Sequence, residues 1–248
     1  MATLDYIDTQ ASGKFSTATN GAVSITTAGA NEVLVVCFYA EQSNAGAPSG
    51  ISVSSVSDTA GLTWAKRKAL PWQGNDSRRN ALEVWWALKP TAGATTITVT
   101  ANVTIDDACL GVVALKSLYN PASPWDTDAS LPGSQAVSGN AAPSATISTQ
   151  QIPLALAFGG ARQNTMTSGR TPTGFTSLLA IANIGGVSVA FEIVSANAYG
   201  SALSSQAVAL DYSGAVVANA GLIVERDYCD RSDELRAAHE QHHSSPSS

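Results

Sequence analysis

The chain has 248 residues, of which 44% are hydrophobic and only 13% are charged, about half the charged share of an average globular protein. Its formal net charge of −6 provides no basic surface for DNA or RNA, so we expect no binding to nucleic acid. Small residues, mainly Ala, Ser, Thr, Gly and Val, make up the difference. They suit flat sheets and subunit contacts better than the surface of a highly charged enzyme.

The sequence begins MATLDYIDTQ, which has neither the basic region nor the apolar segment of a secretory signal. The longest apolar runs, LVVCFYA and ACLGVVAL, have about eight residues, far fewer than the roughly 18 that a membrane-spanning helix needs. We therefore expect a product of the cytoplasm that does not insert into a membrane.

Apolar and polar residues alternate from one end of the chain to the other, with turns rich in Gly, Pro, Ser and Asn between the alternating segments. This pattern predicts strands. In the first half they are expected over residues 21–29, 31–42, 51–58, 80–89, 94–104 and 106–118, and residues 59–70 are expected to form a turn followed by a strand. Residues 119–143 are expected to be loop or sheet edge. In the second half strands are expected over residues 144–150, 152–161, 173–182, 185–196, 205–214 and 219–227.

With short Ala-rich segments such as SLLAIANIGG left ambiguous, this makes roughly ten to twelve strands, and their spacing is typical of a β-sandwich or barrel. We predict one all-β, antiparallel sandwich domain over residues 1–226, because neither half is expected to close its own sheet edges. Residues 227–248 form a polar C-terminal tail in which Leu235 is the one large aliphatic residue. A short helix over about 231–242 would fray unless it docks on another surface.

The order of these segments resembles a jelly-roll-like all-β domain family found in bacteriophage virion proteins and in bacterial surface or secreted proteins. The resemblance covers about residues 15–226 and is strongest in the turn DTAGLTW, from Asp58 to Trp64, and in the hairpin from Glu83 to Thr100. It implies a jelly-roll-like antiparallel β-sandwich and no shared catalytic residues. Because a secretory signal is not evident, the chain is more similar to the phage proteins of this family.

The tail contains His239-Glu240-Gln241-His242-His243, which fits the zinc-protease pattern H-E-x-x-H. An active site of that class needs a buried helix and a third protein ligand, usually downstream. Only SSPSS follows, so we interpret the pattern as a solvated tail, with weak metal binding by His239 and His243 as an alternative. All three histidines lie in this tail. Residues 1–238 therefore cannot form a Ser-His-Asp or Cys-His arrangement.

The acidic clusters of the body are Asp106-Asp107 and the pair Asp126 and Asp128. Paired carboxylates can hydrolyse glycosides, but Asp is also a common turn residue, and Asp106-Asp107 separates two predicted strands. Asp126 and Asp128 could offer oxygen ligands to calcium, although the EF-hand pattern is absent. The favoured interpretation is that both clusters are structural.

The cysteines do not have metal-ligand spacing. Two of them lie in apolar runs, where a free thiol behaves as a small hydrophobe, and the third lies in a polar segment. They are Cys37, Cys109 and Cys229.

Tryptophans supply the candidate contact residues. Adjacent tryptophans on a strand must point to opposite faces, and those that lie beside proline in expected loops are better candidates for exposure. The five tryptophans are Trp64, Trp72, Trp85, Trp86 and Trp125. Trp72 and Trp125 are the two beside proline. Core or interface packing is the favoured interpretation of the tryptophans, and a solvated hairpin is the simpler interpretation of the basic segment that contains Arg78 and Arg79. Should this surface bind a ligand or partner, the candidate contacts are Trp72, Trp125, Arg78 and Arg79.

These observations lead us to expect a non-enzymatic virion structural protein, placed in the capsid, a head fibre or the tail, that contacts other virion proteins and copies of itself. We assign it no catalytic, cofactor or metal residues. The alternative is a carbohydrate-binding adhesin module that recognises a cell-surface glycan, because sugar-binding sandwiches present aromatic platforms.

Overall fold

The structure is a computed structural model that describes residues 7–43, 46, 49–74, 77–116, 121–138, 142–148, 153–162, 172, 174–184, 187–198, 206–209 and 219–228. All regular structure in these residues is β-strand, and all strand pairs are antiparallel. No helix in this part of the chain is long and apolar enough to cross a membrane. The predicted all-β, antiparallel sandwich is therefore confirmed.

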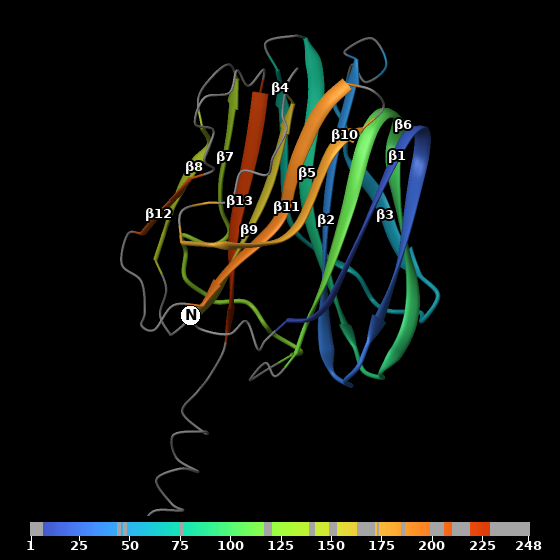
Figure 1. Ribbon diagram of the computed structural model, residues 1–248, viewed down its shortest axis with the longest axis vertical. Helices are drawn as coiled ribbons and strands as arrows, with labels where there is room; N and C mark the ends of the chain where they lie inside the picture. Colours follow the sequence, from blue (N-terminus) through green and yellow to red (C-terminus); the bar gives the residue numbers. More distant parts are fainter. Residues whose placement is uncertain are drawn as a thin grey trace, which may run out of the picture.

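The strands form two large sheets and one small sheet (Figure 1). The first sheet has the order β1-β6-β2-β5-β4, and β3 pairs with β6. Its strands are β1 (Ile7–Thr27), β2 (Glu32–Ser43), β3 (Val53–Asp58), β4 (Ala65–Gln73), β5 (Arg78–Lys89) and β6 (Gly93–Leu115).

The second sheet has the order β10-β11-β9-β13-β7, and the small sheet pairs β12 with β8. The strands of the second sheet are β7 (Gly133–Ser138), β9 (Pro153–Arg162), β10 (Thr176–Ile184), β11 (Val187–Ala198) and β13 (Asn219–Tyr228). The small sheet consists of β8 (Ser144–Ile147) and β12 (Gln206–Ala209).

Strand β2 lies at the centre of the molecule, and both of its faces are buried. Residues such as Val35 and Tyr39 pack with Leu156 and Phe158 of β9 in the core between the two large sheets. The alternate residues, such as Phe38, belong to a second core on the opposite face. A strand covered on both faces needs a continuous apolar run, which explains why the segment LVVCFYA does not alternate.

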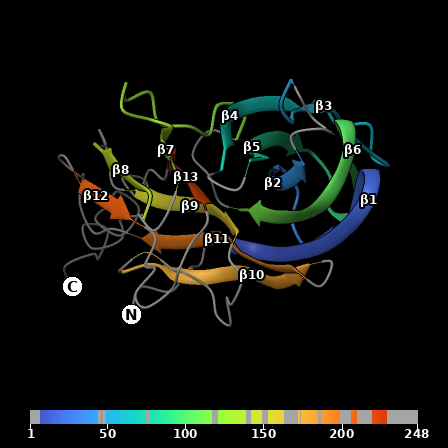
Figure 2. The ribbon, with the colours of Figure 1, turned by 90° about the horizontal axis from the view of Figure 1, so that it is seen from above.

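The second core exists because β1 and β6 bend back over β2. Residues 107–115 of β6 pair with β2, whereas residues 97–101 pair with β3. The β1–β6 register shifts between Ala18 and Asn20, and Thr17 has a positive φ of 51°, so the bend lies there. Phe15, before the bend, packs on Gly21, after it, so closely that a Cβ on this glycine would lie 2.0 Å from the ring. Figure 2 shows both strands curving around β2.

A third core lies between the second sheet and the small β8–β12 sheet. It contains Ile147 and Val208 from the small sheet and Leu222 and Val224 from β13. The described residues therefore pack as four stacked layers of β-structure with three cores between them.

Several predicted boundaries were wrong. Residues 94–104 and 106–118 were expected to be two strands, but most of both belong to the single strand β6. Strand β1 begins at Ile7, well before the predicted residue 21. In each case the segment pairs with a long neighbour, which outweighs local turn signals. Strand β13 continues to Tyr228, one residue beyond the predicted end of the strand at 227. The division into a domain over 1–226 and a tail over 227–248 stays a prediction, and residues 229–248, with the possible helix, lie outside the described residues. The jelly-roll-like connectivity remains a prediction.

Candidate functional site

Trp72 was predicted to lie in an exposed loop, and this was wrong. It lies in β4, and its indole is tilted against Tyr39 at 5.8 Å between ring centroids. Its far edge approaches the backbone of β13, where a Cβ on Gly221 would lie 2.6 Å from the ring. The side chain is half-buried, and Nε1 is buried without a hydrogen-bond partner in the described residues. Pro71 does not end the strand, because β4 is an edge strand, where proline is tolerated.

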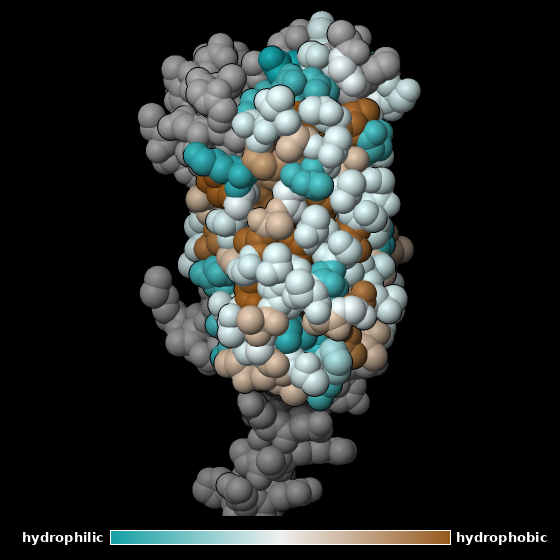
Figure 3. All heavy atoms as spheres, turned by 90° about the vertical axis from the view of Figure 1, so that its right-hand side faces the viewer, coloured by the Kyte–Doolittle hydropathy of each residue, from teal (hydrophilic) through white to brown (hydrophobic). Residues whose placement is uncertain are grey.

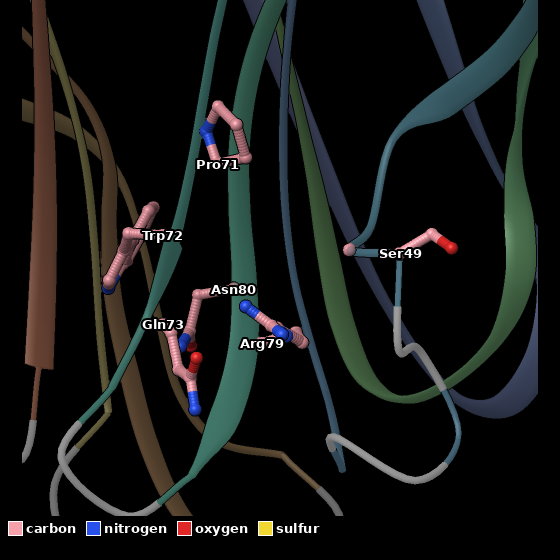
Figure 4. Close-up of a pocket in the computed structure, with 7 residues that line it drawn as sticks. Ser49, Pro71, Trp72, Gln73, Arg79 and Asn80 are labelled. Atoms are coloured by element: carbon pink, nitrogen blue, oxygen red, sulfur yellow. The ribbon is translucent and has the colours of Figure 1, made fainter.

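Trp72 and Arg79 line the same open pocket, which has a volume of about 280 Å³. The pocket lies at the end of the β4–β5 hairpin, beside the segment that precedes β3. Its lining residues are Ser49, Gly50, Pro71, Trp72, Gln73, Arg79 and Asn80. Figure 4 shows the Trp72 ring directed towards the second sheet, whereas Arg79 points to the opposite side, towards Ser49. The structure thus brings two predicted contact residues together at one pocket but turns their side chains to opposite faces.

The difference in orientation follows from the register of β4 and β5. Trp72 pairs with Asn80, and Gln73 pairs with Arg79. Directly opposed residues of an antiparallel pair share a face, and successive residues alternate. Gln73 and Arg79 therefore provide the polar groups on the open side of the pocket. The side chain of Asn80 accepts a hydrogen bond from the Tyr39 hydroxyl at 2.7 Å.

Arg78, the neighbour of Arg79, points into the sandwich and contacts acidic residues. Its Nη1 lies 3.3 Å from Oε1 of Glu41 and 2.9 Å from Oδ2 of Asp106. Glu41 is fully buried, and it lies opposite Asp107 in the β2–β6 register. The predicted contact residue Arg78 thus balances buried negative charge.

Asp107 is buried, and its Oδ1 has no hydrogen-bond partner among the described residues. Burial raises the pKa of the Asp107 carboxyl, the negative charge of Asp106 raises it further, and Arg78 opposes the shift. The Asp106-Asp107 pair was predicted to lie in a turn, but both residues belong to β6. Sequence reasoning missed the partner Glu41, although a glutamate directly after the apolar run VVCFYA was a visible signal.

Trp125 was also expected to be exposed, and this too was wrong, because only 9% of its surface is accessible. It makes a T-shaped contact with Trp86 at 6.0 Å between centroids, and the Arg67 guanidinium lies 5.5 Å from its ring. Trp125 therefore fixes the segment between β6 and β7 to the first sheet. Trp86 and Asn80 are six residues apart on β5, or about 20 Å at the usual rise, so Trp125 does not belong to the Trp72 pocket.

Trp85 and Trp86 do point to opposite faces, as predicted. Trp86 packs against the core between the sheets, and Trp85 packs against the second core. Trp85 donates a hydrogen bond from Nε1 to Glu83 at 2.9 Å, and Lys66 lies 4.9 Å from its ring centroid. These contacts assign both tryptophans to packing.

The loop with Asp126 and Asp128 turns its carboxylates towards its own backbone. Oδ1 of Asp126 accepts the N–H of Asp128 at 2.7 Å, and Oδ1 of Asp128 accepts the N–H of Ser130 at 2.8 Å. Asp126 is buried. In the described part of the chain, no group of three or more His, Cys, Asp or Glu side chains is placed to hold a metal ion. These contacts therefore support a structural role for this loop.

Cys37 and Cys109 are buried free thiols, as their apolar surroundings predicted. Burial raises the pKa of both thiols, which makes them poor nucleophiles. Cys229 and the histidine pattern at 239–243 lie outside the described residues.

The outward side of the layer formed by β1, β6 and β3 is a broad polar surface, which we call the outer face. It consists of Asn20, Ala22, Ser24, Thr26, Ser55, Ser57, Ala94, Thr96, Thr98 and Thr100, all exposed or half-buried. None of these side chains is charged. Ser24 and Thr96 share a hydrogen bond of 2.7 Å between their hydroxyls. Figure 3 looks onto this side of the molecule, where pale residues of intermediate hydropathy predominate over strongly hydrophilic or hydrophobic ones.

No protein family, curated protein or solved structure matches this chain. The resemblance to phage and bacterial surface domains therefore remains a prediction from the sequence.

Proposed function

We propose that this chain is a non-enzymatic bacteriophage virion structural protein that works through contacts with copies of itself and with other virion proteins. The observation that carries the proposal is the outer face. Monomeric soluble proteins usually cover such a surface with Lys, Arg, Glu and Asp of both signs. Here Ser, Thr, Ala and Asn cover it, and these short side chains allow the backbone of a neighbouring subunit to approach closely.

The distribution of the reactive groups supports the same proposal. The two described thiols and the buried carboxylate Glu41 lie inside the packed layers. Trp72 and Trp125 contribute to cores and contacts between sheets. The phage assignment rests on the sequence resemblance of the Asp58-to-Trp64 turn and the Glu83-to-Thr100 hairpin to virion domains.

The proposal can be tested on phage particles whose genome encodes the chain. Mass spectrometry of purified particles should find the protein at a fixed ratio to the major capsid protein, and antibodies against it should label particles at regular positions. A non-structural protein of the same phage serves as the control and should be removed by purification. If the chain is abundant in the infected-cell lysate but absent from purified particles, the proposal is wrong.

One observation favours a second candidate function, the recognition of a cell-surface glycan. The open pocket presents the polar groups of Gln73 and Arg79 beside Ser49. A small number of precisely placed polar groups is enough to orient a small ligand. A glycan array should then give a signal that falls in Arg79→Ala and persists in Lys14→Ala, an exposed basic residue of β1. An array without any signal would overturn this second candidate function.

A further inference from the structure

Strand β1 has an open edge along its C-terminal half. It pairs with β6 on one side, and in the described part of the chain no strand pairs with its other side. The N-terminal half is covered in part by β10, where Nε2 of Gln10 donates to the carbonyl of Leu178 at 3.4 Å. After the bend at Thr17, residues 20–27 form the outermost strand beyond β6 (Figures 1 and 2). Every second residue there directs its N–H and C=O away from the molecule.

This open edge lacks the features that normally protect an edge strand. Natural proteins place Lys, Pro, bulges or inward-pointing charges on exposed edges to prevent them from pairing with another chain. The irregularity of β1 lies between Ala18 and Asn20, before the open segment, and the register with β6 is continuous from Asn20 to Thr27. Residues 15–31 contain no charged residue and no proline. A regular, uncharged edge of this length is therefore suited to accept another strand.

We propose that the open edge of β1 pairs antiparallel with the same edge of a second copy of this chain. The pairing would form one continuous sheet of β3, β6 and β1 from each copy, related by a two-fold axis. A second copy fits this edge, because its inward-facing Val23 and Ile25 can oppose each other about a two-fold axis. Two copies with a net charge of −6 each repel one another over most surfaces, but the edge residues themselves carry no charge, so the contact brings no like charges directly together.

The side-chain pattern also selects the register. Directly opposed residues of an antiparallel pair share a face, so at the two-fold axis each residue must lie opposite the same residue of the second copy. The midpoint of residues 20–27 lies between Val23 and Ser24, so an axis at one of these two gives the longest overlap. An axis at Ser24 places the inward-facing Val23 opposite Ile25 of the second copy, and β-branched pairs stabilise a sheet. An axis at Val23 would instead place Ile25 opposite Gly21, which offers no side chain. We therefore assign the axis to Ser24.

The first test is the mass of the protein in solution. Sedimentation velocity at micromolar concentrations should show a dimer for the wild type. Ser24→Lys places two ammonium groups opposite each other at the axis, and dimerisation should weaken by roughly tenfold or more, because juxtaposed like charges are strongly unfavourable. Ser57→Lys is the matched control. It introduces the same charge on the same outer face, but on β3, away from the β1 edge, and the dimer should persist.

The second test reports the register directly. Opposed residues of an antiparallel pair have Cα atoms about 5 Å apart, which lies within the range of about 4.4–6.8 Å that a disulfide bridges. In a Cys229→Ser background, mild oxidation should therefore join two copies of Ser24→Cys into a covalent dimer. Ser57→Cys, equally exposed, should stay uncrosslinked, and both variants keep the buried Cys37 and Cys109.

This inference rests on the proposed function, since it names one of the subunit contacts, but the two fail differently. A wild-type protein that stays monomeric at all concentrations, or a dimer that Ser57→Lys disrupts as strongly as Ser24→Lys does, would overturn the β1 interface. Absence of the chain from purified particles would overturn the virion proposal, whatever its mass in solution.

Discussion

The indole of Trp72 lies between the Tyr39 ring and the backbone of Gly221, so this glycine is a packing requirement of the sandwich. Gly221→Ala would place a Cβ 2.6 Å from the ring, and we expect the free energy of unfolding to fall by about 1–3 kcal/mol, as is usual for an overpacked core. Urea denaturation measures this change. Gly13→Ala is the control, because its Cβ would meet nothing closer than 3.4 Å. Equal stabilities of the two variants would contradict this packing.

Asp107 gives the fold a pH dependence whose sign follows from its raised pKa. A carboxyl whose pKa is higher in the folded state than in the unfolded state favours folding when protonated. The protonated carboxyl therefore stabilises the fold fully below its pKa in the unfolded state, about 3.9. This stability is lost as the pH rises through the higher pKa of the folded state. Asp107→Asn removes this titration. Relative to wild type, the variant should gain stability between about pH 3 and pH 7, measured by urea denaturation at both values. A difference that does not change with pH would contradict the expected shift.

At the scale of the elements, the turn between β3 and β4 is organised by one carboxylate. Asp58 accepts the N–H of Ala60 at 2.6 Å, the N–H of Leu62 at 3.1 Å and the indole N–H of Trp64 at 2.7 Å. The segment from Asp58 to Trp64, part of the strongest family resemblance, thus forms a turn that its own hydrogen bonds hold together.

Asp58→Ala should lower the free energy of unfolding by about 2 kcal/mol, because it leaves several donors without an acceptor at once. Asp58→Asn, which keeps one acceptor oxygen, should cost less. Equilibrium urea denaturation of both variants tests the order. If the alanine variant loses no more than the asparagine variant, the carboxylate does not organise the turn.

The strands were predictable from the sequence because alternation and apolar runs report local burial. The positions of Trp72 and Trp125 were not, because proline and polar neighbours indicate loops without showing what packs on them. Trp72 is held by Gly221, which lies far away in sequence. Likewise, Asp106-Asp107 resembles a turn until its strand neighbour Glu41 is known. The pocket depends on a register between β4 and β5 that turns Arg78 and Arg79 to opposite faces, and adjacent basic residues alone do not reveal it.

At the scale of the whole molecule, β1 and β6 together connect the central core with the outer face. The N-terminal half of β1 and the C-terminal half of β6 complete the sheet around β2. The C-terminal half of β1 and the N-terminal half of β6 fold back to cover the second core. The layer that closes this core therefore ends in the open β1 edge. Burying the central strand on both faces and exposing an uncharged edge are consequences of the same bend.

This arrangement predicts how salt affects self-association. Each copy carries a formal net charge of −6, and the proposed interface contains no ion pair, so the electrostatic contribution to dimerisation is repulsive. Salt screens charges over about 10 Å at 0.1 M ionic strength. Raising the sodium chloride concentration from about 0.01 M to about 0.5 M should therefore strengthen the dimer several-fold, as measured by sedimentation equilibrium. The Ser57→Lys control, which makes each copy less negative, should show a weaker salt dependence. If salt dissociates the dimer, ion pairs hold the copies together, and the contact must lie on a charged surface away from the β1 edge.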